Sequence, residues 1–153
     1  MEWIWGYREN ERLGGEDPYS ASKSCAEIAC HSYMKSFFSK GDSPKIATTR
    51  AGNVIGGGDW AVDRIVPDCV RAFSGAKKLE VRSPKATRPW QHVLEPLSGY
   101  LWLGANLFQG NEKVAGESFN FGPVNHADRS VEDLITEFQK VWGTGEWYLA
   151  DAG

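Results

Sequence analysis

An α/β fold with at least some parallel strands is predicted by the way candidate helices and strands alternate along the 153 residues. Two amphipathic patterns, at 18–39 and 130–142, indicate helices. Between them, the segment KIATTRAGNVIG at 45–56 indicates a short buried strand that enters a glycine-rich loop. Hydrophobic residues make up 41% of the chain, which is enough for a packed core.

The helix at 18–39 has a clear start. Asp17 followed by Pro18 is typical of a helix N-cap with proline at the first helical position. Apolar side chains then recur at spacings of three and four as far as Phe37, which predicts one apolar face. The GDSP segment at 41–44 ends the helix.

The second half of the chain continues the alternation. Pro67 disfavours the middle of one predicted helix. Ser130, with Asp133 three residues later, resembles a capping box in which Asp replaces the usual Glu or Gln. The expected elements are a helix at 62–74, a strand at 79–83, an extended segment at 88–93, a helix at 95–108, a strand at 117–122 and a helix at 130–142.

Composition excludes several classes of function. The net charge of −3 and the pI near 5.6 give no electrostatic reason to expect a nucleic acid or an acidic membrane as a partner. No apolar run approaches the roughly 20 residues of a membrane span, and the first ten residues do not resemble a signal peptide. An odd number of cysteines without a CxxC motif predicts reduced thiols in a cytoplasmic protein, and three scattered histidines predict no metal site.

A dinucleotide-binding turn is absent from the sequence. Neither a GxGxxG motif between a strand and a helix nor a P-loop occurs in the 153 residues. The glycines at 52, 56, 57 and 58 have neither spacing. The GGG run therefore favours a tight, mobile loop, with a phosphate cradle as the alternative.

Tyr19 and Lys23 lie four residues apart near the start of the first predicted helix, so they share one helix face. An ammonium beside a phenol favours the phenolate and lowers its pKa towards the range in which a general base is efficient. By spacing alone, the favoured interpretation is two ordinary surface residues, because a YxxxK pattern occurs by chance in many helices.

The wider sequence favours the catalytic interpretation. The segments EWIWGYRENERLGGEDPYSASKSCAE, TTRAGNVIGGGDWAVDRIVPD, VRSPKATRPWQHVLEPLSGYLWLG and FNFGP span most of the chain. Together they resemble extended short-chain dehydrogenases/reductases that act on nucleotide sugars, and within that family the 4,6-dehydratases of CDP-hexoses. The resemblance implies a Rossmann-like fold, NAD as the cofactor and a nucleotide sugar as the substrate.

The resemblance also implies roles for the cofactor-side residues. Tyr19 would accept the proton of the sugar 4-hydroxyl, and Lys23 would hold the nicotinamide ribose. The backbone at Ala51 and Gly52 would approach the nicotinamide.

On the substrate side, the resemblance implies that Asn53 touches the phosphates of the nucleotide sugar. Arg64 and Arg88 would pair with its pyrophosphate, for which guanidinium groups are suited. Arg82 would lie nearer the nucleoside. For each arginine the alternative is a solvated surface charge, and His92 is either a substrate contact or a packed residue.

Relatives hold the dinucleotide-binding half before the segment that this sequence matches. We therefore expect an incomplete Rossmann-like fold in one domain, with a catalytic remnant at 1–60 and part of a nucleotide-sugar lobe at 61–153.

Three interpretations of the function follow. The first is a truncated 4,6-dehydratase that binds no NAD alone and is inactive unless a separately encoded N-terminal half joins it. The second is a non-catalytic nucleotide-sugar-binding or oligomerising module, and the third an epimerase or reductase of the family. In relatives the YxxxK helix forms part of a dimer interface, so the resemblance implies a homodimer or larger assembly.

Overall fold

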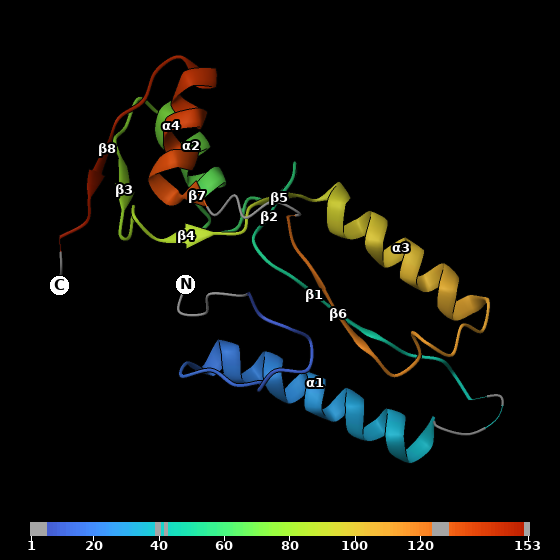
Figure 1. The fold of residues 1–153 in the computed structure, drawn as a ribbon. Coiled ribbons are helices and arrows are strands. Elements are labelled where there is room, and N and C mark those ends of the chain that lie inside the picture. Colours follow the sequence, from blue (N-terminus) through green and yellow to red (C-terminus); the bar gives the residue numbers. More distant parts are fainter. Residues whose placement is uncertain (1–5, 39–40, 42, 124–128, 152–153) are drawn as a thin grey trace. The chain divides into compact units, whose positions relative to one another are not determined.

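The computed structural model describes residues 6–38, 41, 43–123 and 129–151, and its contacts divide the chain into two compact units. The first unit holds residues 1–51 and 94–121, and the second holds residues 52–93 and 122–153. The chain passes from one unit to the other three times, so each unit is built from segments that are distant in sequence (Figure 1).

The first unit is a pair of parallel strands with a helix on each face. Strand β1 (Thr48–Ala51) pairs in parallel with β6 (Ser118–Phe121), so that Arg50 lies opposite Asn120 and Ala51 opposite Phe121. Successive side chains of a strand point to opposite faces. Helix α1 (Pro18–Phe37) binds the Arg50 face through Glu27, and α3 (Leu94–Phe108) covers the Phe121 face (Figure 1).

Close packing of α3 on β6 depends on a glycine. Tyr100 meets the Phe121 ring edge to face, with centroids 5.3 Å apart. A Cβ atom at Gly99 would lie 2.0 Å from a ring carbon of Phe121, which is closer than packed atoms approach. Gly99 therefore lets the helix approach the sheet.

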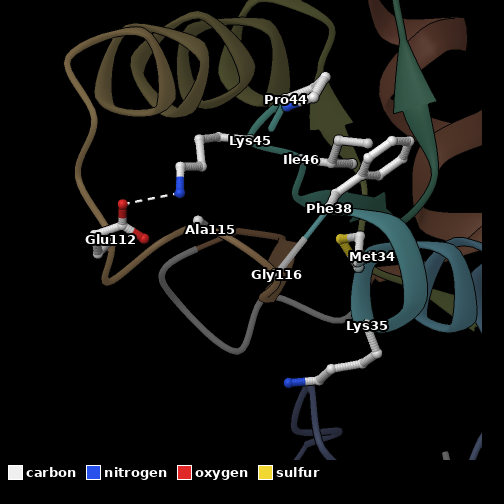
Figure 2. A pocket seen from close by; sticks show the side chains of 9 residues that line it. All are labelled: Met34, Lys35, Phe38, Pro44, Lys45, Ile46, Glu112, Ala115 and Gly116. Atoms are coloured by element: carbon white, nitrogen blue, oxygen red, sulfur yellow. Dashed lines mark ion pairs between the residues drawn. The ribbon is translucent and has the colours of Figure 1, made fainter. Parts of the chain in front are cut away.

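A small pocket lies at the amino ends of these strands. It has a volume of about 180 Å³, and Figure 2 shows Lys45 and Glu112 facing each other beside it, with an Nζ–Oε1 distance of 2.9 Å. Met34 near the end of α1 and Phe38, the residue that follows the helix, contribute to its lining. Ligands of open α/β sheets bind at the opposite, carboxyl ends of the strands, so this pocket is not the expected site.

The second unit has its own core. Helix α2 (Ile65–Ser74) and helix α4 (Val131–Trp142) pack with β3 (Leu79–Val81), which pairs in parallel with β8 (Trp147–Leu149). Their shared apolar centre is made of buried side chains from all of these elements except β8: Cys69, Phe73, Leu79, Val81 and Ile135. Burial raises the pKa of the Cys69 thiol to about 12, so this cysteine is a protonated core residue.

Four short strands, in two pairs, complete this unit. Strand β2 (Val54–Ile55) pairs in parallel with β5 (Gln91–His92), and β4 (Thr87–Arg88) pairs in antiparallel fashion with β7 (Arg129–Ser130). Gly52 lies beside them, and a Cβ atom there would come within 2.7 Å of Pro89 Cγ. Gly52 thus has a packing role that the sequence did not indicate.

The predicted parallel strands are confirmed, and most boundaries shift by only a few residues. Helix α2 begins at Ile65, which puts Pro67 in its first turn, where a missing N–H costs no helical hydrogen bond. The expected extended segment at 88–93 is divided by Pro89 and Trp90 into the end of β4 and the start of β5. Strand β8 was not predicted.

Candidate functional site

Tyr19 and Lys23 lie on the first turns of α1, which starts as the sequence predicts. The Asp17 side chain accepts hydrogen bonds from the Ser20 backbone N–H at 2.9 Å and from the Ser20 hydroxyl at 2.6 Å. These bonds lower the pKa of Asp17, so the cap remains ionised. The helix therefore begins at Pro18 and carries Tyr19 at its second position.

The tyrosine and the lysine are brought together. Lys23 Nζ lies 5.2 Å from the centroid of the Tyr19 ring, so the ammonium sits over the aromatic face. Tyr19 is 67% exposed, and Lys23 is also exposed, so both are open to a ligand. The pair thus meets the geometric requirement of the YxxxK interpretation, which is a shared helix face.

Helix α1 runs in the opposite direction to β1. Glu27 contacts Arg50 near the carboxyl end of β1, whereas Met34, further along the helix, shares the pocket with Ile46 before the strand begins. Lys23 and Tyr19 precede Glu27 by about 6 and 12 Å of helix rise. They therefore lie towards the carboxyl end of the strands, which is the edge where α/β sheets bind ligands.

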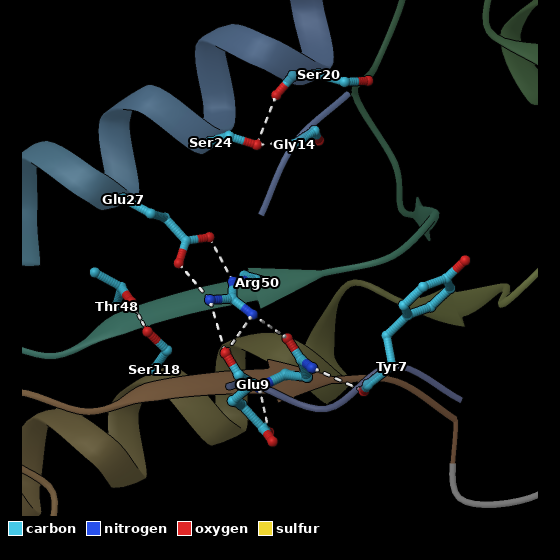
Figure 3. Close-up of polar contacts among 10 residues, drawn as sticks. Tyr7, Glu9, Gly14, Ser20, Ser24, Glu27, Thr48, Arg50 and Ser118 are labelled. Carbon is cyan, nitrogen blue, oxygen red and sulfur yellow. Dashed lines mark hydrogen bonds and ion pairs between the residues drawn. The ribbon is translucent and has the colours of Figure 1, made fainter. Parts of the chain in front are cut away.

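Figure 3 shows what fixes α1 to the sheet at this level. Arg50 Nε and Nη2 each donate to a Glu27 carboxylate oxygen at 2.5 Å, a two-bond fork. The same guanidinium donates to the Glu9 carbonyl at 3.3 Å and to Asn120 Oδ1 at 3.4 Å. Glu9 in turn accepts the backbone N–H of Asn120 at 2.9 Å. Arg50 therefore joins the segment before α1, the helix itself and both strands.

This network was not among the sequence-predicted site residues. Hydrogen bonding by Glu27 raises the pKa of Arg50, and the Asn120 backbone N–H lowers the pKa of Glu9, so Arg50 and Glu9 both stay charged at neutral pH. A signal was available: Glu27 follows Lys23 by one helical turn, and Arg50 is the one charged residue in the strand TTRA.

The remaining predicted residues divide between the units. Ala51 ends β1 in the first unit, and Gly52 opens the second. All five predicted substrate residues lie in the second unit: Asn53, Arg64, Arg82, Arg88 and His92.

Within the second unit, β2 and β5 bring Asn53 and His92 close together in the sheet. The Asn53 carbonyl accepts the Gln91 backbone N–H at 3.0 Å, and His92 is the neighbour of Ile55. His92 is exposed, which disfavours its interpretation as a packed residue. Arg88 lies three residues before Gln91, at the end of β4, and is also exposed.

Two other arginines, Arg64 and Arg82, lie at the end of the loop that follows β2 or contact it. Arg82 Nη2 donates to the Asp63 carboxylate at 2.9 Å, and both side chains are more than 70% exposed. Arg64 is the exposed residue immediately before α2, and its side chain makes no cap bond to the helix. Arg71, by contrast, binds Asp68 and the carbonyls of the loop, a structural role.

The described residues offer neither a cluster of metal-ligating side chains nor a helix that could span a membrane. No group of three or more His, Cys, Asp or Glu side chains there could hold a metal ion. None of the described helices is both long enough and apolar enough to cross a membrane.

Comparison with known proteins shows which family this sequence and fold resemble. Residues 6–122 match the model of the NAD dependent epimerase/dehydratase family. CDP-glucose 4,6-dehydratase of Salmonella typhimurium (strain LT2) is 46% identical over 98% of this chain, and the match covers 43% of that enzyme. The chain thus spans less than half the length of this curated relative.

Solved structures give the same fold. The dTDP-glucose 4,6-dehydratase of Bacillus anthracis str. Ames, in complex with NAD, matches 95% of this chain with a TM-score of 0.74 at 22% identity, over 44% of its own length. The UDP-glucuronic acid 4-epimerase of Bacillus cereus matches 95% of the chain with a TM-score of 0.73 at 21% identity, over 46% of its length. The fold is therefore part of a Rossmann-like α/β fold, and the chain belongs to the NAD dependent epimerase/dehydratase family.

Proposed function

We propose that these 153 residues supply the tyrosine–lysine pair and the nucleotide-sugar contacts of an NAD-dependent 4,6-dehydratase of CDP-hexoses. The observation that carries the proposal is the 46% identity to CDP-glucose 4,6-dehydratase over 98% of the chain. The contact between Tyr19 and Lys23 on an exposed helix face supports it.

The described residues fit one end of NAD. Tyr19 and Lys23 stand at the carboxyl edge of β1, where a phenol and an ammonium could bind the hydroxyls of a nicotinamide ribose. The sequence has no glycine-rich turn to bind the pyrophosphate of NAD at a helix N-terminus. NAD, when bound, supplies the hydride acceptor and donor of a 4,6-dehydratase.

The roles proposed for the chain's own residues follow from the family resemblance, and the chemistry of each side chain suits its role. Tyr19 takes the proton of the sugar 4-hydroxyl as that carbon is oxidised, and the Lys23 ammonium stabilises the phenolate. Arg64 and Arg88 bind the diphosphate through charge-assisted hydrogen bonds, Arg82 lies nearer the nucleoside, and Asn53 and His92 contact the bound substrate. The product of such a reaction is a 4-keto-6-deoxy nucleotide sugar.

A protein made of these residues alone is expected to be inactive, because no NAD is held beside Tyr19. Purified chain should form no 4-keto-6-deoxy product from CDP-glucose and NAD. Product should appear when the part of the Salmonella enzyme outside the aligned region is added as a separate polypeptide. The matched control is the same mixture with Tyr19→Phe, which should give none. Product from the chain alone would refute the inactivity, and no product from the correctly folded mixture would refute the catalytic assignment.

A second function, a nucleotide-sugar-binding module without catalysis, is favoured by one specific observation. All five proposed substrate residues belong to the second unit, which has a core of its own. Exposed apolar side chains on α1, including Ile28, Tyr33 and Phe37, support self-association into a homodimer or larger assembly as part of either function.

A further inference from the structure

Two arginines face each other across the antiparallel pair β4–β7. The Cα partner of Arg88 is Arg129, and the neighbouring pair is Thr87 with Ser130 (strands labelled in Figure 1). Residues directly opposite in an antiparallel pair project from the same face, with Cβ atoms about 5 Å apart. The register therefore sets the two arginine side chains on the same face of the strand pair, and both residues are exposed.

The arrangement differs from that of the neighbouring arginines. In the same unit, Arg71 pairs with Asp68 at 2.7 Å and Arg82 with Asp63 at 2.9 Å. For Arg88 and Arg129, no carboxylate among the described residues comes within ion-pair distance. Within the described part of the chain, Arg88 Nη1 donates to the adjacent Thr87 carbonyl, at 2.9 Å.

The Asp133 carboxylate, whose pKa is influenced by the charge of Arg129, already accepts other hydrogen bonds. Asp133 accepts hydrogen bonds from the Ser130 hydroxyl at 2.8 Å and from the Ser130 backbone N–H at 2.9 Å, as the capping box of α4. These hydrogen bonds are the main cause of the lowered pKa of Asp133, and the positive charge of Arg129 lowers it by a smaller amount. Asp133 is thus fixed by the helix cap and leaves the Arg129 guanidinium able to bind another anion.

Neutral contacts hold the two arginines in place. The Trp90 indole N–H donates to the Arg129 carbonyl at 3.1 Å, and the Val131 backbone N–H donates to the Ala86 carbonyl at 3.0 Å. Like charges directly opposite each other destabilise a strand pair. Here the packing keeps them opposite, so the positive face is built into the fold and an anion bound between them would offset the repulsion.

We propose that Arg129 and Arg88 form a two-arginine clamp for the diphosphate of a nucleoside-diphosphate sugar. Each guanidinium can donate two parallel hydrogen bonds to phosphate oxygens, and two adjacent guanidinium groups match two linked phosphates. The inference rests on the proposed function for the identity of the ligand, whereas the anion site itself follows from the β4–β7 register. It adds Arg129 to the binding residues.

The test measures the affinity of inorganic pyrophosphate for the purified chain by titration calorimetry at low ionic strength. Arg129→Gln and Arg88→Gln should each weaken binding about tenfold, the effect of losing one charge-assisted bond. Lys140→Gln removes an exposed positive charge at the other end of α4 and should change affinity less than twofold. Arg129→Lys, which keeps the charge but not the fork, should fall between wild type and Arg129→Gln. Unchanged affinity in Arg129→Gln would overturn the clamp.

Ligand-free stability separates loss of binding from loss of fold. Because Arg129→Gln removes a like-charge contact, its melting temperature at low salt should equal or exceed that of wild type, and added salt should narrow the difference. If Arg129→Gln instead melts at a lower temperature than wild type, its weaker binding could reflect a damaged fold. The pyrophosphate affinity of Arg129→Lys is then compared with that of wild type instead. A twofold or smaller loss of affinity in both variants overturns the clamp.

CDP-glucose distinguishes this inference from the proposed function. If wild type binds CDP-glucose and Arg129→Gln binds it equally well, the clamp fails while the proposed function stands. If wild type binds pyrophosphate through Arg129 but does not bind CDP-glucose, the clamp stands and the proposed substrate fails. If wild type binds neither, both fail.

Discussion

Replacing Glu27 with alanine is expected to reduce the free energy of unfolding of the first unit by about 3 kcal/mol. The carboxylate and the Arg50 guanidinium form a two-bond ion pair, and their side chains are only 19% and 25% exposed. Removing Glu27 leaves a half-buried guanidinium with the weaker acceptors Glu9 and Asn120. Urea unfolding followed by circular dichroism measures the loss.

Two controls decide what the loss means. Glu137→Ala breaks the exposed pair with Lys140 on α4 and should cost less than about 0.5 kcal/mol. The double variant Glu27→Leu with Arg50→Met replaces the pair by apolar side chains of similar size and should recover most of the stability. A Glu27→Ala loss as small as that of Glu137→Ala would mean that the pair does not fasten α1 to the sheet.

Ile135→Ala is the second large effect, and it concerns the second unit. Ile135 is fully buried, at 0% exposure, among Cys69, Phe73, Leu79 and Val81. Removing its outer carbons leaves a cavity between α2, α4 and β3, at a cost of about 3 to 4 kcal/mol. Thermal unfolding monitored by circular dichroism measures the change.

Graded variants test the cavity explanation. Ile135→Val should cost only about 1 kcal/mol, because one methylene is lost. Val141→Ala, on the same helix but 90% exposed, should be nearly neutral. Equal losses for Ile135→Ala and Val141→Ala would show that this cluster is not the core of the unit.

Much of the fold could be predicted because its signals are local. The cap at Asp17 and the capping box at Ser130 act over a few residues, and each is confirmed. The apolar face predicted for α1 is largely exposed, with only Met34 buried among the residues of the helix. Strand β8 escaped prediction because its residues at 147–149 follow a glycine pair with no alternation, and it forms only by pairing with β3, 68 residues earlier.

The candidate site was predictable to a similar extent. The contact of Tyr19 with Lys23 follows from helical spacing and is confirmed as a contact, while its catalytic role stays a prediction. Arg50 binds Glu27 across 23 residues, and Arg88 faces Arg129 across 41. Such partners are set by the tertiary fold and by strand register, which a single sequence pattern does not reveal. Gly52, expected beside the nicotinamide, also has a packing reason in Pro89.

Our central proposal is that the chain supplies a nucleotide-sugar site but no NAD site of its own. The measurement that tests it most directly is thermal unfolding of the purified chain with CDP-glucose, with NAD and with neither. A ligand at 100 times its dissociation constant stabilises a protein by about 2.7 kcal/mol, which raises the melting temperature by about 2 to 6 °C. We predict such a rise with CDP-glucose and none with NAD. A rise with NAD, or no rise with CDP-glucose, would contradict the account.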